Sequence, residues 1–167
     1  QRIGGLSGQG TLATKARINL LTFTGDADSG ISSSKTYTHL VDFATNSTAP
    51  TINGVTFNNR GAWAFTQNPL SNSWNVADVS DGWGKTGDDT TRTGINALTW
   101  DFVYNNQNWS MELYGLTPGK TYEYRFYYRN FKYNDRTLTF NFYADSQQLG
   151  AIVFNADSIS KTEYGCL

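Results

Sequence analysis

The stretch TYEYRFYYRNFKYNDRTLTFNFYA, residues 121–144, decides the fold, because two of its runs alternate polar and aromatic side chains. Alternation predicts β-strands, since successive side chains of a strand point to opposite faces of the sheet. Pairing residues 121–130 with 136–144 as an antiparallel hairpin gives a core face with two aromatic pairs, Phe126 with Phe140 and Tyr124 with Phe142. The opposite face is then a polar, aromatic platform of Glu123, Arg125, Tyr127, Arg129, Thr139, Asn141 and Tyr143.

A second hairpin is predicted from residues 98–104 and 109–115, whose inward pairs are Tyr104 with Trp109, Phe102 with Met111 and Trp100 with Leu113. Further alternating runs predict strands at 17–23, 37–43, 50–57, 61–66 and 149–155. No window of a dozen residues shows a helical period, so we expect at most a turn or two of helix. The pattern predicts an all-β fold, an antiparallel two-sheet β-sandwich of jelly-roll or immunoglobulin-like type, with at least seven strands.

The chain of 167 residues fits one domain preceded by a short segment. Residues 1–16 are rich in Gly, Thr and Ser, and they are expected to form a flexible arm or linker. Residues 17–167 are expected to form the β-sandwich module.

Between the two hairpins lies LTPGKTY, residues 116–122. This segment resembles the tyrosine corner of fibronectin type III domains, where a Tyr hydroxyl bonds the backbone a few residues upstream. The resemblance implies that Tyr122 is a buried residue of the fold rather than of a binding site.

The composition restricts the function. The formal net charge is −1 without a basic tract, which disfavours nucleic acid and anionic membranes as partners. Charged residues make up 16% and aromatic residues 15%, with abundant hydroxyl side chains, and this favours a secreted, extracellular or cell-surface location. No apolar run is long enough to span a membrane.

Cys166 is the single cysteine, so an intrachain disulfide is excluded. Gln1 in place of a methionine suggests that the start of the chain is processed.

The succession of predicted strands, the stretch GLTPGKTY (residues 115–122) and the aromatic loops resemble β-sandwich carbohydrate-binding modules. These are the jelly-roll or galactose-binding-like modules of secreted bacterial proteins. The resemblance extends over residues 17–155 and implies glycan binding without catalysis. Such modules often have one or two further strands, so we expect that the last strand is either absent or supplied from elsewhere.

Two places combine aromatic rings with planar polar groups, as sugar binding requires. The first is the platform, with Arg125, Tyr127, Arg129, Asn141 and Tyr143, and its alternative interpretation is a solvated outer face. The second is the stretch 67–96, with Trp74, Asp81, Trp83 and Arg92, whose tryptophans alternatively pin the loop to the core.

A calcium site is the one metal site that the sequence suggests. Asp26 and Asp28 lie at alternate positions of the loop GDADSG, residues 25–30, and they offer carboxylate oxygens to a structural calcium ion. D-x-D-x-G patterns are also common in ordinary turns. His39, the single histidine, lies on the apolar face of its predicted strand and is expected to be structural.

Two other function classes remain open. The first is a cell-surface adhesion or fibre subunit, in which the N-terminal arm completes the sheet of another copy. The second is a small polysaccharide lyase or glycosidase using Asp101, Glu112 or Glu123, although the sequence does not place any two of them at a catalytic separation. No zinc or serine-hydrolase motif is present, so an enzyme is disfavoured.

Overall fold

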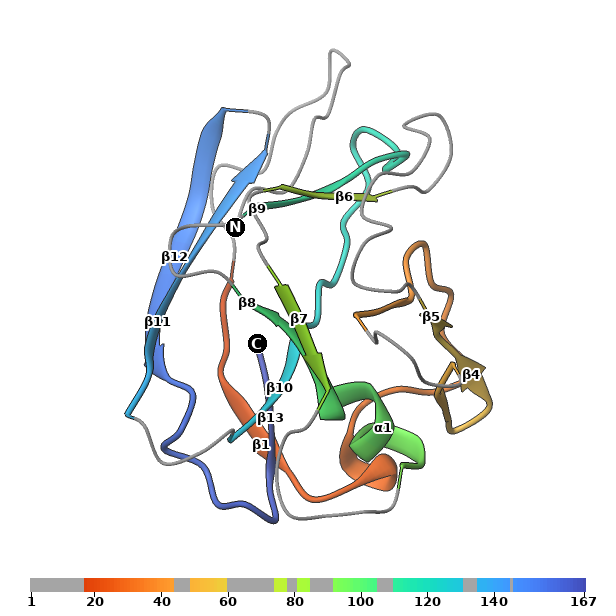
Figure 1. Cartoon of the computed structure of the whole chain (residues 1–167). Helices are drawn as coiled ribbons and strands as arrows, with labels where there is room; N and C mark the ends of the chain where they lie inside the picture. Colours follow the sequence, from red (N-terminus) through yellow and green to blue (C-terminus); the bar gives the residue numbers. More distant parts are fainter. Residues whose placement is uncertain are drawn as a thin grey trace.

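The computed structural model describes residues 17–43, 49–59, 74–77, 81–84, 92–104, 110–130, 135–144 and 146–167 (Figure 1). For residues 59, 74–77, 81–84 and 101–104 the description covers the backbone. The predicted arm 1–16 and the predicted strand 61–66 lie outside these ranges.

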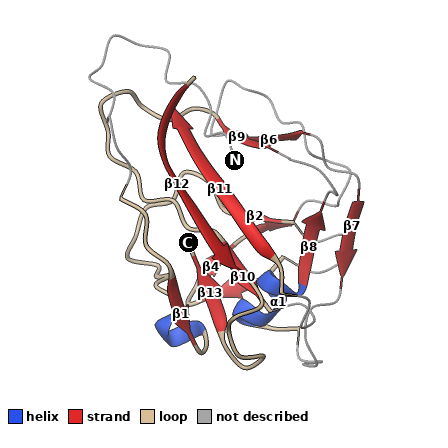
Figure 2. Ribbon diagram, turned by 90° about the vertical axis from the view of Figure 1, so that its left-hand side faces the viewer, coloured by secondary structure: helices blue, strands red, loops and turns tan. Residues whose placement is uncertain are grey.

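Strands make up most of the regular structure (Figure 2). In chain order the elements are β1 (Leu21–Phe23), the short 3-10 helix η1 (Asp26–Asp28), β2 (Val41–Asp42), β3 (Thr51–Ile52), β4 (Val55–Thr56), β5 (Asn58–Asn59), β6 (Trp74–Ala77), β7 (Asp81–Gly84), α1 (Gly94–Trp100), β8 (Asp101–Tyr104), β9 (Ser110–Leu113), β10 (Tyr127–Arg129), β11 (Thr137–Ala144), β12 (Gln147–Asn155) and β13 (Tyr164–Cys166). The 7 residues of α1 form about two turns. The predicted all-β class and the predicted shortage of helix are therefore confirmed for the described residues.

The described strands form one three-stranded sheet and several pairs. The order β1-β13-β10 is antiparallel throughout, and β11–β12, β6–β9, β7–β8 and β3–β4 are antiparallel pairs. The two-residue pair β2–β5 is parallel, contrary to the expectation of antiparallel pairing throughout.

Both predicted hairpins have the wrong partners. The strand β8 pairs with β7, β9 pairs with β6, β10 pairs with β13, and β11 pairs with β12. Yet the two aromatic pairs predicted between residues 121–130 and 136–144 do meet, with ring centroids 4.9 Å apart for Phe126–Phe140 and 6.1 Å apart for Tyr124–Phe142. Alternation determines which side chains share a face, whereas the hydrogen-bonded neighbour depends on the rest of the fold.

The sheet β1-β13-β10 is covered on both faces, and this is where the core lies. On one face Phe23, Tyr164 and Cys166 pack with Ile95 and Leu98 of α1 and with Ile52 and Val55 of the β3–β4 hairpin. On the other face Tyr128 and Leu167 pack with Phe140, Phe142 and Phe154 of the β11–β12 pair. Figure 2 shows β11 and β12 running side by side as the nearest layer. We call this pair the ribbon.

The strand β13, which the alternation pattern did not predict, is the central strand of the three-stranded sheet. The turn before it is held by Arg136, which donates from Nε and Nη2 to the Asp157 carboxylate at 2.9 and 2.8 Å. Asn130 Nδ2 donates to the carbonyl oxygens of Asp157 and Ile159 at 3.0 and 2.9 Å. These bonds direct the chain back between β1 and β10.

Two predicted strands are broken by local structure. Residues 50–57 bend at Asn53 and Gly54, which have φ angles of 49° and 79°, so the run folds into the β3–β4 hairpin. Residues 98–100 of the predicted strand 98–104 belong to α1. The predicted strand 37–43 is reduced to Val41–Asp42.

Asp26 supplies a cap for α1 from a distant loop. Its Oδ1 accepts a hydrogen bond from the backbone N–H of Ile95 at 2.7 Å, in the first turn of the helix. Gly94 has φ +55°, and a Cβ at this position would lie 2.2 Å from Asp26 Oδ2. The glycine therefore permits both the backbone conformation and the close approach of the carboxylate. A capping side chain satisfies a helix N–H that has no partner within the helix.

We predict that Asp26→Ala lowers the free energy of unfolding by about 1–2 kcal/mol, the range typical of a lost helix cap. Urea denaturation followed by circular dichroism measures the change. Asp26→Asn keeps an acceptor oxygen and is the matched control, with a smaller expected loss. Equal stability of wild type and Asp26→Ala would contradict the capping role.

Candidate functional site

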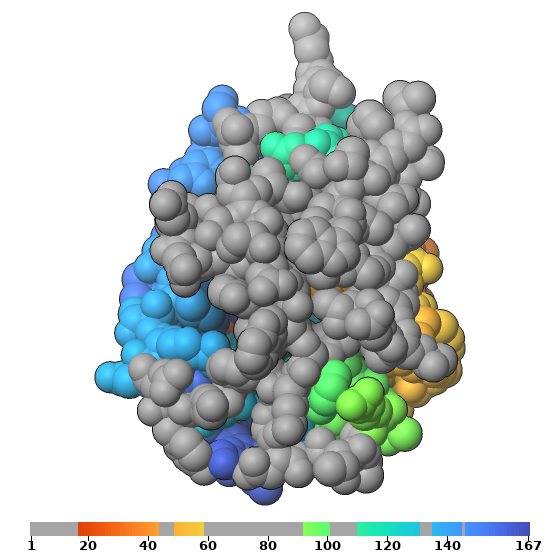
Figure 3. Space-filling view, viewed as in Figure 1, coloured from red at the N-terminus to blue at the C-terminus, as the bar shows by residue number. Residues whose placement is uncertain are grey.

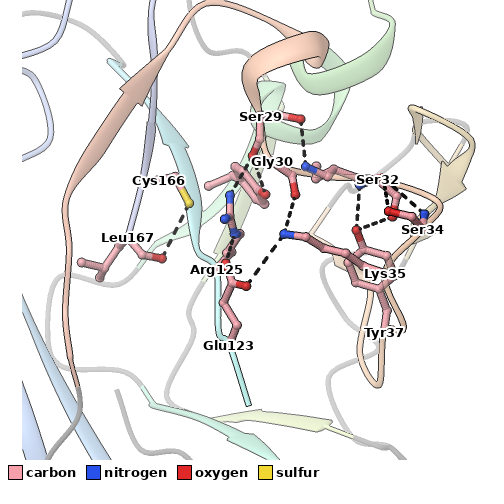
Figure 4. Close-up of polar contacts among 12 residues, drawn as sticks. Ser29, Gly30, Ser32, Ser34, Lys35, Tyr37, Glu123, Arg125, Cys166 and Leu167 are labelled. Atoms are coloured by element: carbon pink, nitrogen blue, oxygen red, sulfur yellow. Dashed lines mark hydrogen bonds and ion pairs between the residues drawn. The ribbon is translucent and has the colours of Figure 1, made fainter. Parts of the chain in front are cut away.

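Arg125 and Tyr127, two residues of the predicted platform, converge on a single carbonyl group. Figure 4 shows Arg125 beside Ser29. Arg125 Nη1 and the Tyr127 hydroxyl each donate a hydrogen bond to the Ser29 carbonyl oxygen at 3.0 Å. Arg125 Nε also forms an ion pair with Glu123 at 2.5 Å. These groups are thus occupied in holding the loop that follows η1.

Lys35 extends the same set of contacts at the surface. Its Nζ donates to the Gly30 carbonyl oxygen at 3.0 Å and lies 3.8 Å from Glu123 Oε2. We call Ser29, Gly30, Lys35, Glu123, Arg125 and Tyr127 the Arg125 network. The hydrogen bond from Arg125 lowers the pKa of Glu123, so this carboxylate stays ionised and paired.

Arg129 does not belong to an exposed platform either. The residue is 8% exposed, its Nη2 donates to the Lys161 carbonyl oxygen at 3.0 Å, and its guanidinium carbon lies 5.2 Å from the centre of the Tyr164 ring. The expectation of one continuous platform on strands 121–130 and 136–144 is therefore wrong. The reason is that β10 and β11 belong to different sheets.

Asn141 and Tyr143, the remaining platform residues, lie on the outward face of the ribbon. In β11 they alternate with the buried side chains of Phe140, Phe142 and Ala144. Their cross-strand partners in β12 are Ala151 and Gln148, respectively. We call this surface the ribbon face, and its members are Thr139, Asn141, Tyr143, Gln148, Ala151 and Val153.

The ribbon face combines a ring, two amides and an apolar side chain. Gln148 Nε2 donates to Asn141 Oδ1 at 3.2 Å, and Val153 is 64% exposed. The register shifts between Phe142 and Tyr143, and a bulge of this kind changes the direction of the neighbouring side chains. In the space-filling view the blue residues of this region form the left-hand margin of the molecule (Figure 3).

The second predicted site is largely outside the described structure. The backbones of Trp74, Asp81 and Trp83 belong to β6 and β7, but their side chains lie outside the described residues. Arg92 is exposed, and its guanidinium carbon lies 3.8 Å from the centre of the Trp100 ring. This contact pairs Arg92 with α1.

The two carboxylates of the predicted calcium loop accept hydrogen bonds from the protein. Asp28 accepts from the backbone N–H groups of Thr24 and Gly25 at 2.9 and 2.8 Å and from the Thr24 hydroxyl at 2.9 Å. The bond from the Thr24 backbone lowers the pKa of Asp28. Asp26 caps α1, as described above. Within the part of the chain that the structure describes, no group of three or more His, Cys, Asp or Glu side chains could hold a metal ion. Calcium binding stays a prediction.

Tyr122 and His39, the residues predicted to be structural, have hydrogen-bond partners but are less buried than expected. The Tyr122 hydroxyl accepts a hydrogen bond from the backbone N–H of Thr117 at 2.7 Å, which is the bond predicted for a tyrosine corner. Hydrogen bonding by the Thr117 side chain and then by its backbone lowers the pKa of Tyr122. Tyr122 is nevertheless 38% exposed, so its predicted burial is wrong. His39 is half-buried, and its Nδ1 lies 3.0 Å from the Thr38 hydroxyl.

The carboxylates considered for catalysis have protein partners as well. Glu112 accepts a hydrogen bond from the Tyr114 hydroxyl, and Glu123 is part of the Arg125 network. The side chain of Asp101 lies outside the described residues.

Gln148 is not among the residues predicted for the site, although the sequence contains a signal for its position. Only four residues, 145–148, separate the predicted strands 136–144 and 149–155, and such a short connection favours a hairpin between them. The pair Asn53-Gly54 is likewise a strong hairpin signal between residues that favour β-structure, and it lies inside the predicted strand 50–57.

Comparisons with protein-family models, with curated proteins and with solved structures find no match for this chain. Among the described residues, no helix is long and apolar enough to cross a membrane.

The buried thiol of Cys166 and the half-buried phenol of Tyr127 predict how stability depends on pH. Burial raises the pKa of Cys166 to about 11 from an ordinary value of 9.0, and that of Tyr127 to about 12 from 10.0. The folded protein therefore holds these protons more tightly than the unfolded chain. The free energy of unfolding should fall as the pH rises from 9.0, first through Cys166 and above 10.0 also through Tyr127.

Urea denaturation at a series of pH values measures this profile. In Cys166→Ala the fall should begin near the ordinary tyrosine pKa of 10.0 instead of near 9.0. A profile that is unchanged by this substitution would contradict the burial of the thiol.

Proposed function

We propose that this chain is an extracellular β-sandwich module that binds a glycan without cleaving it, and that the ribbon face is its binding surface. The observation that carries the proposal is the grouping of Tyr143, Asn141 and Gln148 on one outward surface. A ring and two amides supply stacking and hydrogen bonding, and this favours binding over catalysis.

The layered core supports the sandwich part of the proposal. The inner side of the ribbon packs through Phe140, Phe142 and Phe154 against Tyr128 and Leu167 of the three-stranded sheet region. Two β-layers with a shared aromatic core are what a sandwich requires. The outer side of the ribbon is then available to a ligand.

The chemistry of sugars fits this surface. A pyranose ring has apolar C–H faces, which stack on an aromatic ring such as that of Tyr143. Its hydroxyl groups bond to planar amides, which Asn141 and Gln148 supply. Ala151 and Thr139 are small and exposed, so they leave room beside the ring and the amides.

An assembly or adhesion function, with other copies of the chain as partners, is the second candidate. It is supported by β1, which has β13 as its one partner among the described strands. Leu21 of β1 is 51% exposed, and Leu20, which precedes the strand, is 42% exposed. An edge strand with apolar side chains is a template for pairing with another chain. In this proposal the segment 1–16 of one copy adds to the edge of another.

Size-exclusion chromatography of the whole chain and of Leu21→Lys tests the assembly function, since a charge on the edge strand should abolish self-association.

We predict that Tyr143→Ala weakens binding to the best ligand from a glycan array by several-fold or more. A stacked ring typically contributes about 1 kcal/mol beyond the area that it buries. Titration calorimetry measures the affinity, and Tyr143→Phe, which keeps the ring, is the matched control. Trp83→Ala tests the other predicted stacking residue in the same assay. Unchanged affinity in Tyr143→Ala would exclude the ribbon face as the binding surface.

A further inference from the structure

The two strands of the ribbon contain no ionisable acidic or basic residue other than Tyr143. The sequences TLTFNFYA (Thr137–Ala144) and QQLGAIVFN (Gln147–Asn155) contain no Asp, Glu, Lys, Arg or His. The residues that flank β11 in the sequence include Asp135, Arg136 and Asp145, and Arg136 is paired with Asp157. The ribbon face itself therefore offers no cation to a carboxylate or sulfate group. This distribution of charge favours an uncharged ligand.

The amides of Asn141 and Gln148 have a defined polarity. Because Gln148 Nε2 donates to Asn141 Oδ1, the Asn141 amide keeps its N–H donors and the Gln148 amide keeps its carbonyl acceptor. No other hydrogen bond to these two amides is found among the described residues. The pair thus presents the NH2 donor group of Asn141 beside the carbonyl acceptor of Gln148, with the second Gln148 N–H next to it.

A hydroxyl group both donates and accepts hydrogen bonds. Two adjacent hydroxyl groups on a sugar ring therefore match the pair, one accepting from Asn141 and the other donating to Gln148. Gln148 is the cross-strand partner of Tyr143, so a ring bound by the amides lies next to the aromatic side chain.

We infer that the ribbon face selects a neutral glycan through a vicinal diol, with Asn141 as donor, Gln148 as acceptor and Tyr143 as the stacking ring. This inference rests on the proposed function and specifies its ligand. It makes Asn141 and Gln148 residues that determine specificity, and it excludes uronate-rich or sulfated polysaccharides as the preferred ligands.

Titration calorimetry with neutral polysaccharides (β-glucan, xylan and mannan) and acidic ones (polygalacturonate and alginate) tests the inference. We expect a neutral polymer to bind and Asn141→Asp to lower its affinity about tenfold, because it removes the N–H donor. Gln148→Glu should lower the affinity by a similar factor, because it removes the N–H that bonds to Asn141 Oδ1 and so orients the Asn141 amide. A methylated form of the bound polymer, whose hydroxyl hydrogens are blocked, should bind more weakly by a similar factor.

Gln147→Glu is the matched control, because it adds the same charge to the same strand one residue away, where successive side chains point to opposite faces. It should leave the affinity within about twofold of the wild type. Circular dichroism and thermal unfolding confirm that all variants are folded.

The outcomes distinguish the inference from the proposed function. If an acidic glycan is the preferred ligand, or if both amide variants bind as well as the wild type while Tyr143→Ala does not, the diol inference is wrong and glycan binding stands. If none of the polymers and no glycan of the array binds, both are wrong.

Discussion

The described structure depends on one loop whose polar groups are bonded to residues far away in the sequence. In residues 24–31, the Asp26 carboxylate caps α1, and the carbonyl oxygens of Asp26 and Ile31 accept from Asn53 Nδ2 at 2.7 and 3.0 Å. The Ser29 carbonyl oxygen accepts from Arg125 and Tyr127. A helix, a hairpin and the strand β10 are therefore fixed to one segment. Buried or half-buried carbonyl groups need such partners, because their desolvation is unfavourable without them.

The position of β13 follows from a similar constraint. The turn before it is held by the side chains of Asn130 and Arg136. Tyr164 and Cys166 of β13, and Leu167 directly after it, are each less than one-tenth exposed. Because alternate residues of β13 point to the two faces of the sheet, this short strand contributes to both halves of the core. The ribbon packs on one of these faces, and its outward side becomes the candidate binding surface.

The candidate site illustrates how polar residues of one predicted surface acquire different roles. Arg125 and Tyr127 point toward the Ser29 carbonyl group, and Arg129 is buried against Tyr164. Asn141 and Tyr143 lie on the ribbon face and meet Gln148, which the sequence analysis had not selected. A planar guanidinium or phenol has the same chemistry in both settings, so residue type could not separate a ligand-binding role from a structural one. The carbonyl groups of Ser29 and Lys161, which accept hydrogen bonds from these side chains, show that their role here is structural.

The sequence by itself determined the all-β class, the scarcity of helix, and the inward position of the aromatic rings at Tyr124, Phe126, Phe140 and Phe142. It could do so because alternation is a local property: a two-residue period fixes the two faces of a strand wherever that strand is placed. The resemblance of residues 116–122 to a tyrosine corner also predicted that the Tyr122 hydroxyl bonds the backbone a few residues upstream, and the partner is Thr117. Tertiary structure alone paired β9 with β6 and β10 with β13, placed β13 at the centre of a sheet, and turned part of a predicted strand into α1 with a cap from Asp26. Each of these features joins segments dozens of residues apart, and their energies depend on partners that no local pattern specifies.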